Sequence, residues 1–189
     1  MTGTSLVTLL SDRIEDNSHV RFTSSQKVNA LNQAQDFLVA TLPVEKLRLL
    51  ETSTTKSNNS GGVVSVSEFA ILRDHLVSVQ NATTLEYGTV IYHDKKDVTS
   101  SYISPCYLLG SDLYYPTAWD TGEAVGIGLN VTYLSVPTDI ADSSSVLPLT
   151  DIHYNIICDM AESILWNTDN KPQRAQFAEQ RALAQIQTL

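Results

Sequence analysis

The chain has 189 residues, 42% of them apolar, and its 12 Lys and Arg against 21 Asp and Glu give a formal net charge of −9. These values are ordinary for a globular protein and exclude a wholly disordered chain. The acidic balance argues against a protein that grips a nucleic-acid backbone, because such a protein neutralises phosphates with Lys and Arg. Solubility alone also accounts for an acidic surface.

The sequence shows no secretory leader and no apolar run of about 18 residues, the length that a membrane-spanning helix needs. We therefore expect no signal peptide and no membrane partner. The two cysteines, Cys106 and Cys158, lie far apart and form no CxxC motif. Cys158 falls within a predicted helix, which favours a free buried thiol and leaves a disulfide open.

Helical spacing marks the first 50 residues. Residues 4–15 predict a short helix with Leu6, Leu9, Leu10 and Ile14 on one side. A capping-box pair, Thr23 and Gln26, then opens a predicted helix over residues 24–41, and Pro43 stands close to its end.

The pattern changes in the middle of the chain. Residues 52–62 contain no apolar side chain and predict a linker or loop. The apolar period then becomes two, which indicates strands. The clearest strand is Val125–Tyr133, whose odd-numbered positions are all apolar. Further strand candidates are Val64–Val66, Leu76–Val79, Leu85–Tyr92 and a hairpin of Cys106–Leu109 with Asp112–Tyr115.

The segment Val146–Trp166 predicts one long helix, with Thr150 as its N-cap. Its wide apolar stripe requires cover from other elements. The polar side chains Asp159, Glu162 and Ser163 are expected to point largely away from that stripe. A last helix over residues 171–188 follows, with an alanine-rich side.

These elements predict an α+β fold: a helical bundle from the two ends of the chain with an inserted antiparallel β module. The expected domains are residues 1–51 with 146–189 for the bundle, 52–62 for the linker and 63–145 for the β module.

The sequence predicts no enzyme, no cofactor and no catalytic or metal-binding residues. GxxxxGK[ST], HExxH and GxSxG are all absent, and Gly126-Ile127-Gly128 lies within a predicted strand. The four histidines are scattered and are expected to be structural or solvated: His19, His75, His93 and His153. Asp94 and Asp97 flank a turn that contains two lysines, which favours a solvated turn over a metal site.

The order of several segments resembles that of phage head-to-tail adaptor proteins, also called connector or head completion proteins. The N-terminal part of the resemblance is Leu31–Pro43, and the part that returns to the bundle is Leu147–Leu165. The strands between them are similar in order and character to that family's inserted β region: Ile71–Asn81, Tyr107–Thr117 and Leu129–Ile140.

This resemblance implies a structural virion protein of the phage neck, made in the host cytoplasm. It implies a homo-oligomeric ring that follows the dodecameric portal protein and extends the DNA channel used in DNA ejection. The tail side of the ring would meet a tail, stopper or nozzle protein, and genomic DNA would pass without specific binding. The family docks onto the portal through its C-terminal segment, here Ala178–Leu189.

We hypothesise that Leu183, Ile186 and Leu189 contribute to the portal interface; packing of all three inside the bundle is the other interpretation. A stopper or tail-completion protein further down the neck is an alternative function. From other classes, a soluble enzyme with an unrecognised site and a soluble binding module built on the β insertion stay open. A binding module predicts exposed aromatic side chains on one face, drawn from Tyr107, Tyr114, Tyr115 and Trp119, whereas a sheet core would bury them.

Overall fold

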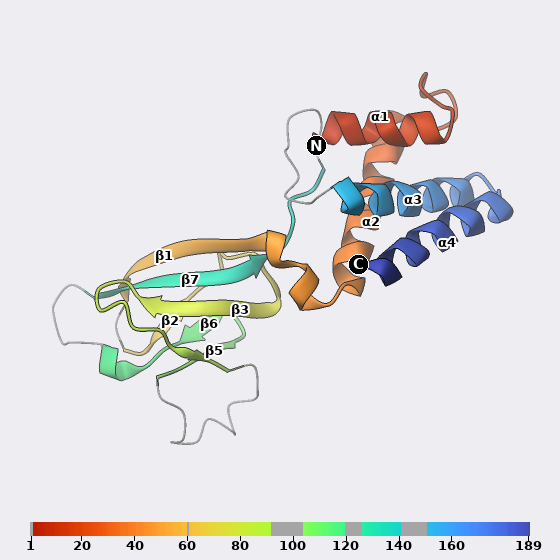
Figure 1. Ribbon diagram of the computed structural model, residues 1–189. Helices are drawn as coiled ribbons and strands as arrows, with labels where there is room; N and C mark the ends of the chain where they lie inside the picture. Colours follow the sequence, from red (N-terminus) through yellow and green to blue (C-terminus); the bar gives the residue numbers. More distant parts are fainter. Residues whose placement is uncertain (1, 60, 92–103, 120–125, 141–150) are drawn as a thin grey trace. The chain divides into compact units, whose positions relative to one another are not determined.

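The computed structural model describes residues 2–59, 61–91, 104–119, 126–140 and 151–189 (Figure 1). Its residues form two compact units, a helical unit of Met1–Leu49 with Pro137–Leu189 and a β unit of Leu50–Val136. The predicted α+β class, with helical ends and a β insertion, is confirmed. That the units are independent domains stays a prediction.

The first two helices begin at hydroxyl caps. Helix α1 spans Gly3–Arg13, and the Thr2 side chain accepts a hydrogen bond from the Ser5 N–H. Helix α2 spans Ser24–Thr41 and begins with the predicted capping box, in which Thr23 and Gln26 each bond the other's backbone N–H. Two short 3-10 helices follow, η1 over Val44–Lys46 and η2 over Arg48–Leu50.

The last two helices are joined by a tight turn and pack side by side (Figure 1). Helix α3 spans Asp151–Thr168 and α4 spans Pro172–Thr188. Asn170 has a φ of +55°, a conformation typical of the residue that ends a helix. Pro172 then opens α4, where a missing N–H costs nothing. The predicted N-cap Thr150 lies outside the described residues.

Helix α3 is covered on more sides than its sequence indicates, because α1, α2 and α4 all pack against it. The predicted apolar stripe is buried, with Tyr154, Ile157 and Leu165 each at most 3% exposed. The expectation that Asp159 and Ser163 point away from the core is wrong, since each is only 3% exposed. Side chains of α1 and α4 cover Asp159, since Arg13, Arg181 and Gln185 contact its carboxylate.

The β unit contains two sheets. The first has the order β1-β7-β3, all antiparallel, from Glu51–Asn59, Ile127–Ser135 and Ile71–Asn81. The second has the order β2-β6-β5-β4, from Val63–Ser65, Asp112–Tyr114, Pro105–Leu109 and Thr89–Val90. Its β5–β6 hairpin is the predicted one, whereas the two-residue β4 pairs with β5 in parallel.

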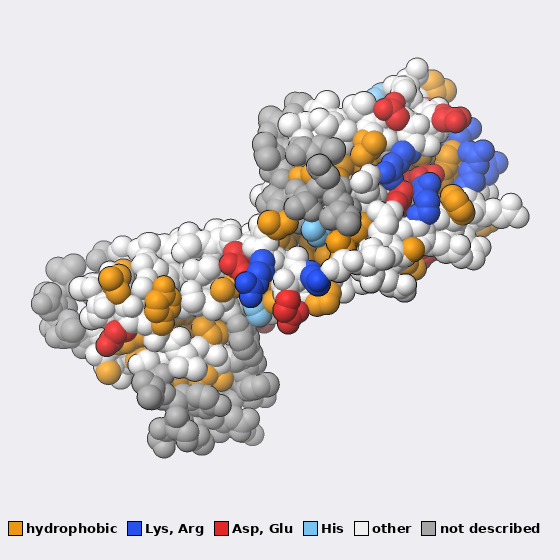
Figure 2. Space-filling view, viewed as in Figure 1, with side chains coloured by type: hydrophobic (Ala, Val, Ile, Leu, Met, Phe, Trp, Pro, Cys, Tyr) orange, Lys and Arg blue, Asp and Glu red, His pale blue; other side chains and the backbone are white. Residues whose placement is uncertain are grey.

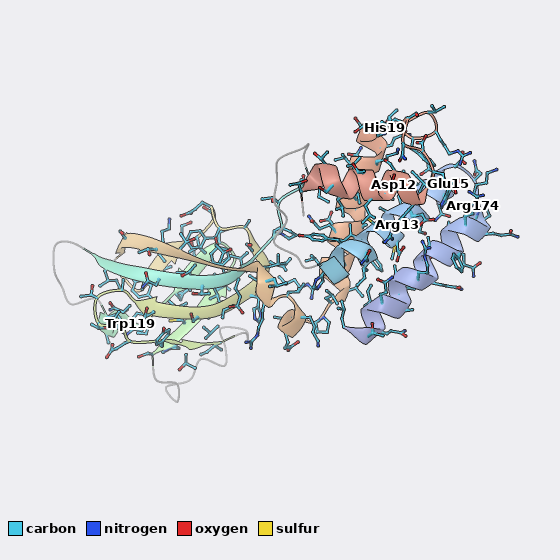
Figure 3. All side chains as sticks on the ribbon, turned by 45° about the horizontal axis from the view of Figure 1, so that its top comes forward. Asp12, Arg13, Glu15, His19, Trp119 and Arg174 are labelled. Atoms are coloured by element: carbon cyan, nitrogen blue, oxygen red, sulfur yellow. The ribbon has the colours of Figure 1, made fainter. Side chains whose placement is uncertain are left out.

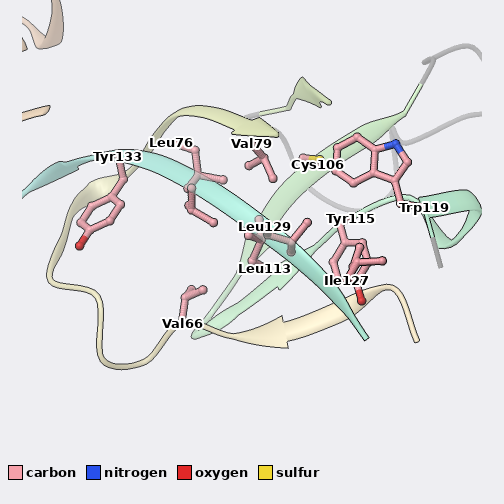
Figure 4. Packing of buried hydrophobic residues seen from close by; sticks show 11 residues of the cluster. Val66, Leu76, Val79, Cys106, Leu113, Tyr115, Trp119, Ile127, Leu129 and Tyr133 are labelled. Atoms are coloured by element: carbon pink, nitrogen blue, oxygen red, sulfur yellow. The ribbon is translucent and has the colours of Figure 1, made fainter. Parts of the chain in front are cut away.

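The predicted alternation of β7 builds the core of the β unit (Figure 4). Ile127, Leu129, Val131 and Tyr133 are buried, while the residues between them are half-buried. A second sheet and the short helix η4, Thr117–Trp119, contribute to the same cluster. Its other buried members are Val66, Leu76, Val79, Cys106, Leu113, Tyr115 and Trp119.

Two predictions in this unit are wrong. Most of the expected linker 52–62 is the edge strand β1, which pairs with β7 from Glu51 to Asn59. The backbone ladder and the β-branched threonines stabilise this strand without an apolar face. The expected strand Leu85–Tyr92 shrinks to Thr89–Val90 in the described residues, because Leu85 has a φ of +61° and lies in a turn.

Candidate assembly surfaces

The described residues contain no group of three or more His, Cys, Asp or Glu that could hold a metal ion. His19 lies between α1 and α2, His75 in β3 and His153 in α3. His93, Asp94 and Asp97 lie outside the described residues. Burial lowers the pKa of His153, which favours its neutral form. The candidate functional features are therefore surfaces and the charged groups that shape them.

A charged network joins three helices of the helical unit. The Asp159 carboxylate of α3 accepts hydrogen bonds from Arg13 of α1 at 2.5 Å and from Gln185 of α4 at 2.6 Å. It also forms an ion pair with Arg181 of α4 at 2.9 Å. Arg181 also reaches Glu162 at 2.5 Å. Because Asp159 is buried, these charge-assisted bonds fix α1 and α4 on α3.

A groove of about 400 Å³ lies beside this network. The end of α1 and the following turn contribute Arg13 and Glu15, and α4 contributes Arg174, which lie at the same end of the helical unit (Figure 3). The Arg174 guanidinium stacks over the buried Trp166 ring at 4.8 Å. Phe177, 63% exposed, stands at the edge of the groove with the Arg181 guanidinium 5.3 Å from its ring centre.

A second charged group holds the turn between α1 and α2. The fully buried Lys27 ammonium lies 3.2 Å from the Asp16 carboxylate and donates to the Ser11 hydroxyl at 3.0 Å. Burial alone would raise the pKa of Asp16, but hydrogen bonds from the Arg21 and Phe22 N–H groups and from Lys27 lower it well below its usual range. This pair therefore holds the turn before α2 against α1 and α2.

Of the three residues expected at the portal interface, Leu183 and Ile186 lie on the second half of α4, and Leu189 is its C-cap. The buried side of this helix consists of small residues, Ala175, Ala178 and Ala182. Leu183 is 37% exposed, and Ile186 and Leu189 are half-buried. The bundle thus leaves part of each side chain accessible, which is compatible with a portal contact and does not test it.

The four aromatic residues on which a binding module would depend do not form one open face. Tyr115 and Trp119 are 4% exposed and belong to the core. Tyr107 and Tyr114 are half-buried and stack on each other with ring centres 4.9 Å apart. The interpretation of these four side chains as core and sheet packing therefore has the stronger support.

Both thiols are free and buried, Cys106 in the β unit and Cys158 in the helical unit. Burial raises the pKa of each to about 12. The free buried state predicted for Cys158 is confirmed. Neither thiol is poised for nucleophilic chemistry, which needs a thiolate.

The described residues thus form a two-unit α+β chain in which buried charged groups order the helices. Within the same residues, no helix has the length and apolar character to cross a membrane. The chain matches the family model described as SU10 adaptor protein over residues 1–189, and it belongs to that family. It is thus a bacteriophage adaptor protein, as the resemblance in its sequence implied. No curated protein matches the chain.

Proposed function

We propose that the chain forms a homo-oligomeric ring in the phage neck, where it joins the portal protein to the tail and extends the DNA channel. Membership in the adaptor family carries this proposal. The expected copy number follows the dodecameric portal, and the tail-side partner is a tail, stopper or nozzle protein. The ring is a component of the virion neck through which DNA leaves during ejection.

Charge supports a channel function. Each copy carries a formal charge of −9, so a ring of copies repels DNA and lets it pass without specific binding. On the face of the helical unit seen in Figure 2, blue cationic and red anionic side chains lie beside one another. Several of its cations form ion pairs or lie over aromatic rings, such as Arg13 on Asp159 and Arg174 on Trp166. Such paired cations contribute little to binding of a phosphate backbone.

We place the portal contact on the accessible side of α4, at Leu183, Ile186 and Leu189. An apolar side chain that is partly accessible in the free protein can become fully buried against a partner, which is a source of binding free energy. The alanine side of α4 already packs in the bundle, so this contact would leave the fold of the helical unit intact.

Binding to purified portal protein tests this placement. Leu183→Asp with Ile186→Asp, and separately deletion of Thr188 and Leu189, should weaken portal binding at least about tenfold. Gln180→Asp is the matched control, because Gln180 is an exposed residue of the same helix. Unchanged binding of both α4 variants, with melting temperatures like that of the wild type, would remove the interface from α4.

A stopper or tail-completion protein further down the neck is the alternative function. It predicts binding to the tail-side proteins of the neck and none to the portal, so the same experiment separates the two functions. The soluble binding module loses its main support because Tyr115 and Trp119 are buried.

A further inference from the structure

Two exposed pairs of residues in the helical unit have complementary chemistry. On α4, the Arg174 guanidinium has no carboxylate partner among the described residues, and Phe177 is 63% exposed one turn further along. On α2, the Asp36 carboxylate is exposed and likewise has no cationic partner among the described residues, and its neighbour Phe37 is 39% exposed. Each pair combines one charged group that has no oppositely charged partner among the described residues with one exposed aromatic ring.

These two rings are the exceptions among the aromatic residues of the helical unit. Phe22, Tyr154 and Trp166 are all at most 3% exposed. An exposed aromatic side chain next to an unpaired charge is typical of an interface, where the ring supplies apolar area and the charge supplies orientation. The fold therefore leaves one cationic and one anionic surface of this kind.

Helices α2 and α4 both pack on α3, so the two surfaces come from different helices on one rigid support. A contact between unlike surfaces of identical chains is head-to-tail, and it closes into a ring when the rotation allows. The groove beside Arg174 adds a site for the incoming side chains, because it is lined by Arg13, Trp166 and Phe177 and measures about 400 Å³.

We propose that the α4 groove of one copy receives the Asp36–Phe37 surface of the next copy, with the Asp36 carboxylate on Arg174 and the Phe37 ring beside Phe177. The occupant is a second copy of this chain. Opposite charges across the contact set its direction, and like charges at the same place would oppose it. This inference rests on the proposed ring and names the residues that join neighbouring subunits.

Charge reversal tests the contact, with loading of the chain onto purified portal rings as the readout. Asp36→Arg and Arg174→Asp should each reduce full loading about tenfold or more when tested alone, because each places like charges together. The controls reverse an exposed charge of the same unit elsewhere: Asp12→Arg for the anion and Arg48→Asp for the cation. Both controls should load like the wild type.

Two further samples separate a lost contact from a lost fold. The double variant Asp36→Arg with Arg174→Asp restores opposite charges and should regain loading. An equal mixture of the two single variants should also regain it, because copies that alternate around the ring place opposite charges at every junction. At one junction the two introduced charges face each other, and at the next the native Asp36 faces the native Arg174. All samples are repeated without portal at high protein concentration, where sedimentation measures self-association directly.

Normal loading and normal self-association of both single variants would overturn the inference and leave the portal proposal intact. If Arg174→Asp loses loading and neither the double variant nor the mixture restores it, the groove binds another protein. That result would also overturn the proposed contact between copies. A wild type that does not bind portal refutes the proposed function. In that case, the sedimentation experiment decides. Self-association of the wild type that is lost in both single variants and regained in their mixture supports the contact, and a wild type that does not self-associate overturns it.

Discussion

The helical and β units differ in the kind of side chains that they bury. The helical unit buries charged groups, with Lys27 at 0%, Asp159 at 3% and Asp16 at 7% exposed. The core of the β unit is a cluster of apolar and aromatic residues, and its ion pair between Lys56 and Glu68 lies at the surface (Figure 4). The helical unit should therefore depend on hydrogen-bond geometry and pH, and the β unit on shape complementarity.

The largest effect is expected in the apolar part of the helical unit. Tyr154 is 2% exposed in the middle of α3, so Tyr154→Ala should lower the free energy of unfolding by about 3–5 kcal/mol. Tyr87→Ala in the β unit is the control, because Tyr87 is 67% exposed, and it should change stability by at most about 0.5 kcal/mol. Equal losses in chemical denaturation would contradict the assigned burial.

The next effect tests shape complementarity in the β unit. A Cβ added at Gly88 would lie 2.2 Å from the Cys106 sulfur and 3.2 Å from Cη2 of Trp119. Gly88→Ala should therefore cost about 1–3 kcal/mol through overpacking. Cys106→Ala removes the sulfur, so the double variant should be more stable than the two single losses predict by addition. If the two stability losses simply add, the added methyl group does not clash with the Cys106 sulfur.

Acid should distinguish the two units. The Asp16 pKa is lowered from its usual 3.8, so the folded state favours the carboxylate. The contribution of the Asp16 carboxylate to the stability of the folded state is present above about pH 4, where an unfolded aspartate is ionised. It is lost as the pH falls further.

Each unit contains one tryptophan, Trp166 in the helical unit and Trp119 in the β unit. The variants Trp119→Phe and Trp166→Phe let fluorescence follow each unit separately. As the pH falls below about 4, the signal of Trp166 should change before that of Trp119. In the Asp16→Asn background, which lacks this carboxylate, the helical unit should be less stable at neutral pH and its stability should depend less on acid. Loss of Trp119 signal first would reverse the comparison.

The smallest effect concerns the thiols, one in each unit. With both pKa values raised to about 12, neither Cys106 nor Cys158 should react with a thiol reagent in the folded protein at pH 8. Both should react at once in denaturant. Above pH 9, where an unfolded thiol ionises, this burial should begin to cost stability, and the cost should grow until about pH 12. Fast labelling of either cysteine at pH 8 would show that its unit opens locally.

The sequence predicted those features that follow from local spacing. The Thr23 and Gln26 capping box and the alternation predicted for Val125–Tyr133 each contain their own signal. The structure confirms the capping box and the alternation over Ile127–Tyr133, whereas Val125 lies outside the described residues. Strand β1 could not be predicted in this way, because its polar side chains say nothing of the backbone partner supplied by β7. Backbone hydrogen bonds to a neighbouring strand can hold an edge strand in place even when its side chains show no apolar alternation.

The charged network around Asp159 and the groove beside it depend on tertiary packing and were missed. Arg13 and Asp159 are 146 positions apart, so no local pattern indicates that they pair. Burial of Lys27 also follows from the close approach of α2 to the preceding turn, since lysine alone predicts exposure. A signal did exist for α4: an alanine side with Phe177 and Leu183 off that side predicts a helix that packs closely yet keeps apolar groups accessible.

Electron cryo-microscopy of portal rings incubated with the purified chain tests the central claim most directly. The account predicts a closed ring of added density on the tail-facing side of the portal, with one copy of this chain for each portal subunit and an open channel along the axis. Portal rings without added density, or with isolated copies that form no ring, would contradict it.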